Sequence, residues 1–334
     1  MARSFAALAC LAGCTLSPRA PAPPEGCDAV ASIVAALHAH PVVMLGEQHR
    51  RREDHALLQA LVRDPRLAGS VDDIVVEFGS AREQPVLDRY LAGEAVPQDA
   101  LRRVWRDTTQ IVTWDSPVYA DFFRAVREVN GHGAHLRVLL GDPPIDWANV
   151  QGKDDYARYA DRDGFFASVV EQQVLANHRR ALVIIGGEHV ARTAPSEPAA
   201  RHPGVGDILM AHHVDAFAIM PVPPNHVPPG MPACIPAIVP ATGALGAASF
   251  GTMSEPNVMV QRIVDGKPTW VKRDTTDWPA IRDKVDALLW LGATSSEVAS
   301  PPAEGDYLRE LHRRAQIMSD FYGFDLTADL PPLP

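Results

Sequence analysis

Side chains that could do acid–base or metal chemistry follow four short apolar runs of this chain. They are Glu47 and His49 after 41–46, Glu77 within 73–78, Asp142 after 136–141, and Glu188 and His189 after 181–187. A histidine beside a carboxylate is typical of a general base, because the carboxylate fixes the tautomer and raises the basicity of the ring. The same residue types also bind metal ions. The chain therefore has the side chains for an active or binding site, provided that the four runs meet.

The four runs must be neighbouring strands for these side chains to meet. Each run is short, rich in β-branched residues and almost unbroken by polar residues, which is typical of parallel strands covered by helices on both faces. In open parallel sheets the ligand crevice lies beyond the carboxyl ends of the strands. We therefore expect an α/β fold, a mostly parallel sheet with helices on both faces, and one site at one sheet edge. Helices are expected at about 29–38, 51–63, 83–92, 98–105, 117–130 and 163–177.

The first motif, Gly46-Glu47-Gln48-His49, can be interpreted in two ways. In one, His49 is a general base with Glu47 as its partner. In the other, Glu47 caps the next helix and His49 is merely exposed. His55 follows six residues later, which is not the spacing of a zinc-protease histidine pair, so His55 is expected to pack or to support the site.

Glu77 interrupts an otherwise apolar strand, and a buried carboxylate is costly without a partner. Pairing with His49 or Arg162 would offset that cost. Arg162 could instead bind a substrate oxygen, or form a charge pair at a helix start with Asp163.

The remaining two strand ends also leave alternatives open. His189 could belong to the site or be a solvated loop histidine. Asp142, followed by two prolines, could simply begin a rigid turn, and it is the weakest member of the set.

Composition and missing motifs exclude several functions. The 334 residues are 46% hydrophobic, enough for a large core, and the net charge of −10 leaves no basic stripe for nucleic acid. The chain has no Gly-x-Ser-x-Gly elbow, Walker phosphate loop, Gly-x-Gly-x-x-Gly or Cys-x-x-Cys motif. A serine hydrolase, a nucleotide kinase and a Rossmann dehydrogenase are therefore disfavoured.

The N-terminus is typical of an exported lipoprotein. Arg3 is followed by the apolar stretch Phe5–Ala12. The end of this stretch overlaps Leu11-Ala12-Gly13-Cys14, which has the form of a bacterial lipobox. We expect residues 1–13 to be a signal peptide, Cys14 to carry a diacylglycerol with palmitate-type chains, and 14–27 to be a tether. The protein would then be anchored to a membrane of the bacterial cell envelope. The alternative is an ordinary cleaved signal peptide with an incidental cysteine.

The rest of the chain is expected to form one domain. Residues 28–222 would be the α/β core, 223–256 a Pro/Gly-rich loop region, and 257–334 a C-terminal strand and helices that complete it. Eight prolines in 221–240 predict that no regular element forms there, and 281–291 contains an amphipathic stretch. Cys27 and Cys234 could form a disulfide in an oxidising compartment or be two unrelated small residues.

The order of these motifs resembles a known superfamily. Strand–Gly-Glu-x-His, strand–Glu, a helix starting Arg-Asp and strand–Gly-x-x-His, over roughly 40–192, are similar to the erythromycin esterases, the ChaN-like haem-binding lipoproteins and the Tiki/TraB group. Two features depart from the pattern. Glu188 stands where relatives often have a small or amide residue, and the segment 221–240 has no counterpart.

The resemblance implies three kinds of function. The esterase branch implies metal-independent hydrolysis, with His49 activating water, Glu47 and Glu77 supporting the imidazoles, and Arg162 and His189 stabilising an oxyanion. The Tiki branch implies a divalent metal, with possible ligands Glu47, His49, Glu77 and His189.

The ChaN-like branch implies an outer-membrane lipoprotein that binds haem. Axial ligation would need a residue such as Tyr90, Tyr119 or Tyr156, though spacing singles out none of them. We expect a lipid-anchored hydrolase acting on a small ester or related carbonyl. The alternative is a non-catalytic lipoprotein that binds haem or a metal.

Overall fold

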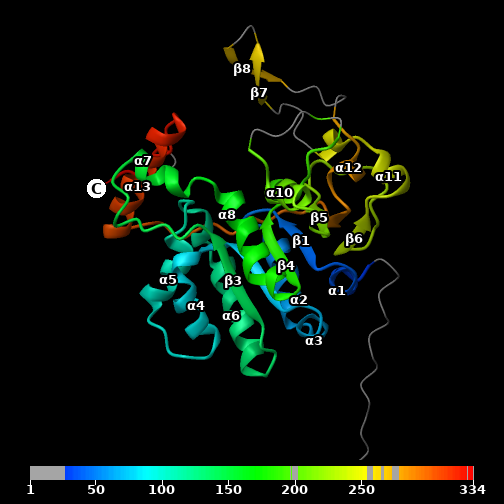
Figure 1. Cartoon of the computed structure of the whole chain (residues 1–334), viewed down its shortest axis with the longest axis horizontal. Helices are drawn as coiled ribbons and strands as arrows, with labels where there is room; N and C mark the ends of the chain where they lie inside the picture. The colour runs from blue at the N-terminus through cyan, green and yellow to red at the C-terminus, as the bar shows by residue number, and fades with distance from the viewer. Residues whose placement is uncertain are drawn as a thin grey trace, which may run out of the picture.

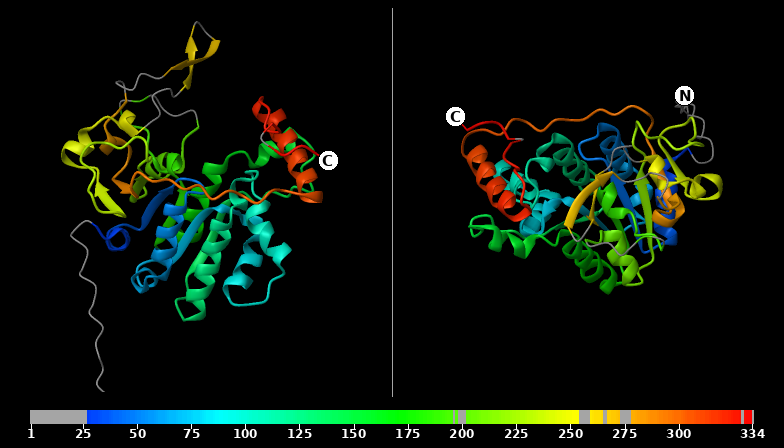
Figure 2. Two further views of the ribbon diagram at one scale, coloured as in Figure 1. Left: turned by 180° about the vertical axis from the view of Figure 1, so that it is seen from behind. Right: turned by 90° about the horizontal axis from the view of Figure 1, so that it is seen from above.

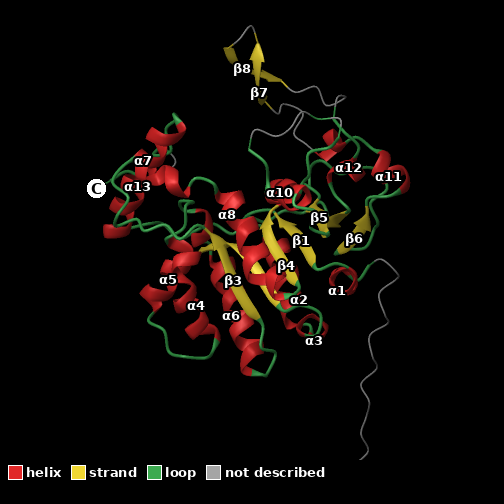
Figure 3. Cartoon of the chain, in the orientation of Figure 1, coloured by secondary structure: helices red, strands yellow, loops and turns green. Residues whose placement is uncertain are grey.

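A seven-stranded sheet forms the centre of the molecule, flanked by helices on both faces (Figures 1 and 3). The computed structural model describes residues 27–195, 197, 202–253, 259–264, 267–272, 278–328 and 330–333. The strands of the sheet are β1 (Val42–Glu47), β2 (Asp73–Ser80), β3 (Arg137–Asp142), β4 (Ala181–Gly186), β5 (Ala216–Pro221), β6 (Ala237–Pro240) and β9 (Ala287–Trp290). Their order is β3-β2-β4-β1-β5-β9-β6, and every neighbouring pair is parallel except β6 with β9. The expected fold class is therefore confirmed.

Alternate residues of the central strands enter two separate cores, as the two-residue period of a strand requires. Val43 and Leu45 of β1 point into one core, whereas Val42 and Met44 point into the other. The first core is covered by α1 (Ala29–Ala39), α2 (Arg52–Arg63), α3 (Pro65–Ala68), α4 (Gln84–Leu91), α5 (Gln98–Arg106) and α6 (Pro117–Gly131). The second is covered by α8 (Arg162–Val169) with its continuation to 177, α10 (Val205–Ala211), α11 (Gly243–Ala247) and α12 (Ile281–Lys284). Burial on both faces explains why the strand sequences are apolar throughout.

A smaller third core lies beside the sheet. The last long helix, α13 (Gly305–Tyr322), packs Ile317 and Met318 against Ile145, Trp147 and the segment around α7 (Lys153–Tyr156). Among the described residues, β7 (Met259–Val264) and β8 (Lys267–Lys272) form a separate two-stranded antiparallel hairpin. None of the helices that the structure describes is long and apolar enough to cross a bilayer.

Two sequence expectations for the C-terminal half were wrong. Strand β6 and helix α11 lie in 223–256, where proline content predicted loops. Because β6 is a four-residue edge strand with Pro240 at its end, proline is tolerated there. The stretch 281–291, expected to be amphipathic, holds the four-residue helix α12, with only Ile281 buried, and then β9, a strand buried throughout. A short apolar run fits a buried strand as well as a helix, so periodicity alone could not separate them.

A disulfide joins Cys27, two residues before α1, to Cys234, three residues before β6, with the Cα atoms 5.7 Å apart. The two residues are 207 positions apart in the sequence, so the bond closes most of the chain into one loop. The expected signal peptide 1–13, the lipidation site Cys14 and all of the tether except Cys27 lie outside the described residues.

We predict that replacing both Cys27 and Cys234 with Ser lowers the free energy of unfolding by about 2–5 kcal/mol, because the cross-link restricts the unfolded chain. Denaturant unfolding of the oxidised protein with and without reductant measures the effect, and the double variant should not respond to reductant. Two free thiols in the native protein after oxidising expression would contradict the pairing.

Candidate active site

The expected site residues lie at the carboxyl ends of four neighbouring strands. Reading across the sheet from β3 through β2 and β4 to β1, the ends carry Asp142, Glu77, the Gly186–His189 turn, and Glu47 with His49. The turn after β4 includes the short helix α9 (Gly187–Val190). Although β4 comes last of these four strands in the sequence, it lies between β2 and β1 in the sheet. This strand order places His189 between the two glutamates, which the chain order alone does not reveal.

Glu47 is a buried carboxylate with three partners. His49 Nδ1 lies 3.0 Å from Oε1, and the Tyr119 hydroxyl donates to the same oxygen at 3.1 Å. His55 Nε2 lies 2.9 Å from Oε2, without the alignment of a hydrogen bond. Burial favours the neutral acid, but His55 and His49 outweigh it and hold the pKa of Glu47 at about 2. Glu47 is therefore ionised throughout the neutral range.

An ionised Glu47 determines how His49 is protonated. Because a carboxylate only accepts hydrogen bonds, Nδ1 of His49 must be the donor, and Nε2 of the neutral ring carries the free lone pair. Burial lowers the pKa of His49, but the hydrogen bond to Glu47 outweighs it and the pKa is raised above its ordinary value. The ring packs edge-on against the buried Trp114, with centroids 4.7 Å apart. His49 is therefore a fixed imidazole with a basic nitrogen to offer.

His189 forms a second histidine–carboxylate pair. Its Nδ1 lies 2.6 Å from Asp163 Oδ1, and its Nε2 lies 3.8 Å from Glu77 Oε1. Burial lowers the pKa of His189, but Asp163 and Glu77 together raise it above the ordinary value. The sequence expectation linked Asp163 only to a charge pair with Arg162, and its contact with His189 was missed.

Arg162 pairs with two buried carboxylates. It donates to Glu77 Oε1 at 2.8 Å and to Asp142 Oδ2 at 3.3 Å. Glu77 also accepts from the backbone N–H of Gly186, and Asp142 accepts from both the N–H and the hydroxyl of Thr109. Of the two partners expected for Glu77, the structure shows Arg162. Two guanidinium nitrogens of Arg162, Nε and Nη2, donate to these acids, and the expected binding of a substrate oxyanion by Arg162 stays a prediction.

Gly186 lets the two imidazoles approach each other. A Cβ at this position would lie 2.8 Å from His49 Cε1, which is closer than real Cβ contacts, and 3.3 Å from His189 Cδ2, which is a tight contact. Both rings line a pocket of about 380 Å³ at the sheet edge, together with Glu47, Gln48, Gly186, Gly187, Glu188, Met220, Pro221 and Pro223. A much smaller cavity behind it, about 10 Å³, is lined by Glu77, Asp142, Arg162 and His189 among others.

An extended segment, residues 292–300, holds the turn that carries His49. It leads from β9 toward α13 across the carboxyl end of the sheet (Figure 2). The buried Arg51 donates to the carbonyls of Gly292 and Thr294 and to the side chain of Gln48. Val298 N–H donates to the Arg50 carbonyl, and Arg50 N–H donates to the Tyr119 hydroxyl. These contacts between distant parts of the chain were not predicted from the sequence.

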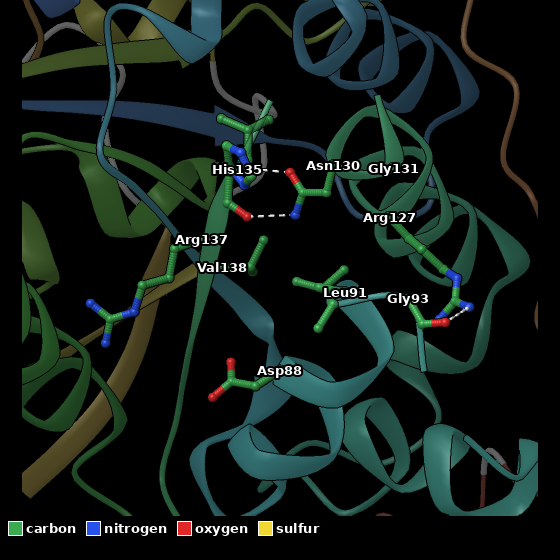
Figure 4. A pocket seen from close by; sticks show the side chains of 11 residues that line it. Asp88, Leu91, Gly93, Arg127, Asn130, Gly131, His135, Arg137 and Val138 are labelled. Carbon is green, nitrogen blue, oxygen red and sulfur yellow. Dashed lines mark hydrogen bonds between the residues drawn. The ribbon is translucent and has the colours of Figure 1, made fainter. Parts of the chain in front are cut away.

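A second, larger pocket, about 570 Å³, lies beside the amino end of β3 (Figure 4). The arginine side chains in its wall are already paired with other groups of the protein. Arg127 donates to the carbonyls of Tyr90, Gly93 and Glu94, and Arg137 pairs with Asp73. Because these groups are already paired and none belongs to a motif, this pocket is not our candidate site.

Metal ligation receives no support from the arrangement. Within the described ranges, no group of three or more His, Cys, Asp or Glu side chains is placed to hold a metal ion. The expected ligands Glu47, His49, Glu77 and His189 instead bind one another and neighbouring protein groups.

We predict that Gly186→Ala displaces both imidazoles, because the added methyl group would clash with His49 and press on His189. The histidine ring signals in an NMR spectrum report this directly. Gly187→Ala is the matched control, since its Cβ would meet Pro221 at 3.1 Å and no histidine atom within its three nearest contacts. Unchanged signals of His49 and His189 in a folded Gly186→Ala protein would contradict this geometry.

Comparison with known proteins gives one family match. The family described as haem-binding uptake, Tiki superfamily, ChaN matches residues 33–137, less than half of the chain. A search of curated proteins found no match. Solved structures that match the chain include the type III effector HopBA1, at 12% identity over 81% of this chain and 96% of that one, with a TM-score of 0.41. An erythromycin esterase EreC mutant in its open conformation is 12% identical over 80% of this chain and 94% of that one, with a TM-score of 0.49.

A third structure is that of ChaN of Campylobacter jejuni with cofacially bound haem. It is 14% identical over 57% of this chain and 85% of that one, with a TM-score of 0.38. With TM-scores below 0.5, the solved structures assign no function to this chain. Over residues 33–137 the chain is similar to the haem-binding uptake, Tiki superfamily, ChaN family, as the order of its motifs predicts.

Proposed function

We propose that this protein is a hydrolase of small esters or related carbonyl compounds, with His49 as the general base. The observation that carries the proposal is the contact between His49 Nδ1 and the buried, ionised Glu47, beside a pocket that His49 itself lines. An orienting carboxylate on one ring nitrogen leaves the other free to take a proton. This is the arrangement that a water-activating base requires.

The reaction would proceed in two steps. His49 Nε2 takes a proton from water as the water oxygen bonds to the carbonyl carbon, giving a tetrahedral oxyanion. That intermediate then collapses, the bond to the leaving oxygen breaks, and the leaving oxygen takes a proton. The proton comes either from the imidazolium of His49, which restores the base, or from His189, which is then reprotonated through solvent as His49 releases its proton. A protonated His189, held by Asp163, would stabilise the oxyanion or supply that proton. Arg162 and Glu77 would hold His189 in place from behind.

We predict that His49→Ala lowers the rate of ester hydrolysis by about 10²–10⁴-fold while the protein stays folded, because the variant loses general-base assistance. Hydrolysis of a panel of neutral esters measures the loss, and circular dichroism checks the fold. His132→Ala, which removes an exposed histidine near the end of α6, is the control. Full activity in a folded His49→Ala protein would overturn the proposal.

The pH dependence gives a separate test. A base works only when deprotonated, so the rate should rise with pH through a pKa of His49 above its ordinary value. Glu47→Gln removes the charge that raises this pKa, so we predict that the acid limb of the pH–rate profile moves to lower pH and the plateau falls. An acid limb that stays in place would show that Glu47 does not tune the base.

Haem capture is the second candidate, and the family match favours it. The site itself fits haem less well. Tyr119 and Tyr156, two of the three tyrosines available as axial ligands, are fully buried, and Tyr119 donates a hydrogen bond to Glu47. Tyr90 contacts Arg127 beside the pocket of Figure 4, at the other end of the sheet. The candidate pocket has two glutamates, a glutamine and two histidines in its wall, whereas haem needs an apolar crevice. Haem is added to the protein and its Soret band is measured. A shift of this band that the wild-type protein causes and the His49→Ala protein does not would support haem capture against hydrolysis.

We further propose that the protein is exported and anchored through lipidated Cys14. The lipobox supports this, and so does the Cys27–Cys234 disulfide, because disulfides persist in oxidising compartments and are rare in the cytosol. Mass spectrometry of the membrane fraction would test it: the mature chain should begin at Cys14 and carry a lipid, and Cys14→Ser should abolish both.

A further inference from the structure

We propose that the pocket prefers esters carrying an alkylammonium group, and that Glu188 supplies this preference. The inference rests on the proposed hydrolase function and names its substrate class. Glu188 follows the strand β4 as part of α9 and is exposed in the wall of the pocket that both imidazoles line. It plays no part in the two histidine–carboxylate pairs, so those pairs do not explain why an acid stands there.

The charges around the pocket leave Glu188 uncompensated. Glu47, the other carboxylate in the wall, already contacts His49, His55 and Tyr119. Within the part of the chain that the structure describes, Glu188 forms no hydrogen bond or ion pair with another residue. No lysine or arginine is among the residues that line this pocket. A bound cation would therefore meet one free negative charge, whereas an anion would meet only repulsion from it.

The rest of the wall suits the alkyl part of such a cation. Met220, Pro221 and Pro223 line the same pocket and offer apolar contact. An ammonium ion carrying methyl groups needs both features, a negative charge and apolar surface, because its methyl groups cannot be hydrated as a bare ammonium is. The net charge of −10 acts in the same direction by attracting cations to the molecule.

The test compares two substrates that differ only in charge. A choline ester and the 3,3-dimethylbutyl ester of the same acid have nearly the same shape, but only the first is cationic. With the purified full-length protein, we expect kcat/KM to favour the choline ester about two- to fivefold at low salt, as for an exposed charge pair, and the ratio to fall toward one at high salt. Glu188→Gln should lower kcat/KM for the choline ester and bring the ratio between the two esters close to one. Glu128→Gln is the control, because it removes the same charge from an exposed position near the far end of α6.

The outcomes separate this inference from the proposed function. Equal rates for the two esters, or a preference that survives Glu188→Gln, would overturn the inference while leaving the hydrolase standing. If neither ester is hydrolysed, the hydrolase proposal fails for this class. Binding of choline and of 3,3-dimethylbutanol is then compared through the NMR signals of His49 and His189. A stronger response to choline that Glu188→Gln removes would still support cation binding, whereas equal responses would refute it.

Discussion

The site depends on keeping one carboxylate, Glu47, ionised inside the protein. Removing a charge from water is costly, and a buried charge left without its partners destabilises a fold by about 3–5 kcal/mol. Glu47 meets this demand with His49 from the following turn, His55 from α2 and Tyr119 from α6. The positions of the turn and of two helices are therefore tied to one strand end. The same charge orients His49, so the requirement for stability and the requirement for a base are met by the same contacts.

The second histidine pair is built by different elements but on the same principle. Glu77 and Asp142 share Arg162, and Asp163, the next residue, orients His189. Each buried acid is thus paired with a cation or a ring that it also positions. Asp54 shows the contrast: burial and the charge of Glu47 raise the pKa of Asp54 to about 7, despite the nearby Arg51. The site therefore keeps one carboxylate near β1, Glu47, ionised, whereas burial beside Glu47 disfavours the ionisation of a second, Asp54.

Much of this arrangement was predictable from local patterns. The apolar runs gave the four strands, and the acids and histidines that follow them could be recognised because parallel strands place their carboxyl ends together. Glu77 needed a partner on energetic grounds alone, and Arg162 was one of two candidates. The pairing of Cys27 with Cys234 was left open, because sequence does not show which cysteines are close in space.

Other parts of the site depend on contacts between distant segments and could not be predicted from local patterns. Tyr119 lies 72 positions from Glu47 and looks like any core aromatic of an amphipathic helix. Arg51 reads as one of three consecutive arginines, yet it alone is buried where the 292–300 segment crosses the site. Strand β9 was missed because its apolar run is too short to distinguish from a helix.

The most direct test of the account is the tautomer of His49, measured by 15N NMR of the imidazole in the native protein. An ionised Glu47 acting on Nδ1 requires that the neutral ring carries its proton on Nδ1 and leaves Nε2 free. We predict that tautomer in the wild-type protein. A neutral His49 protonated on Nε2 would contradict the account, because Nδ1 would then be unable to donate to Glu47 and Nε2 would be unable to act as the base.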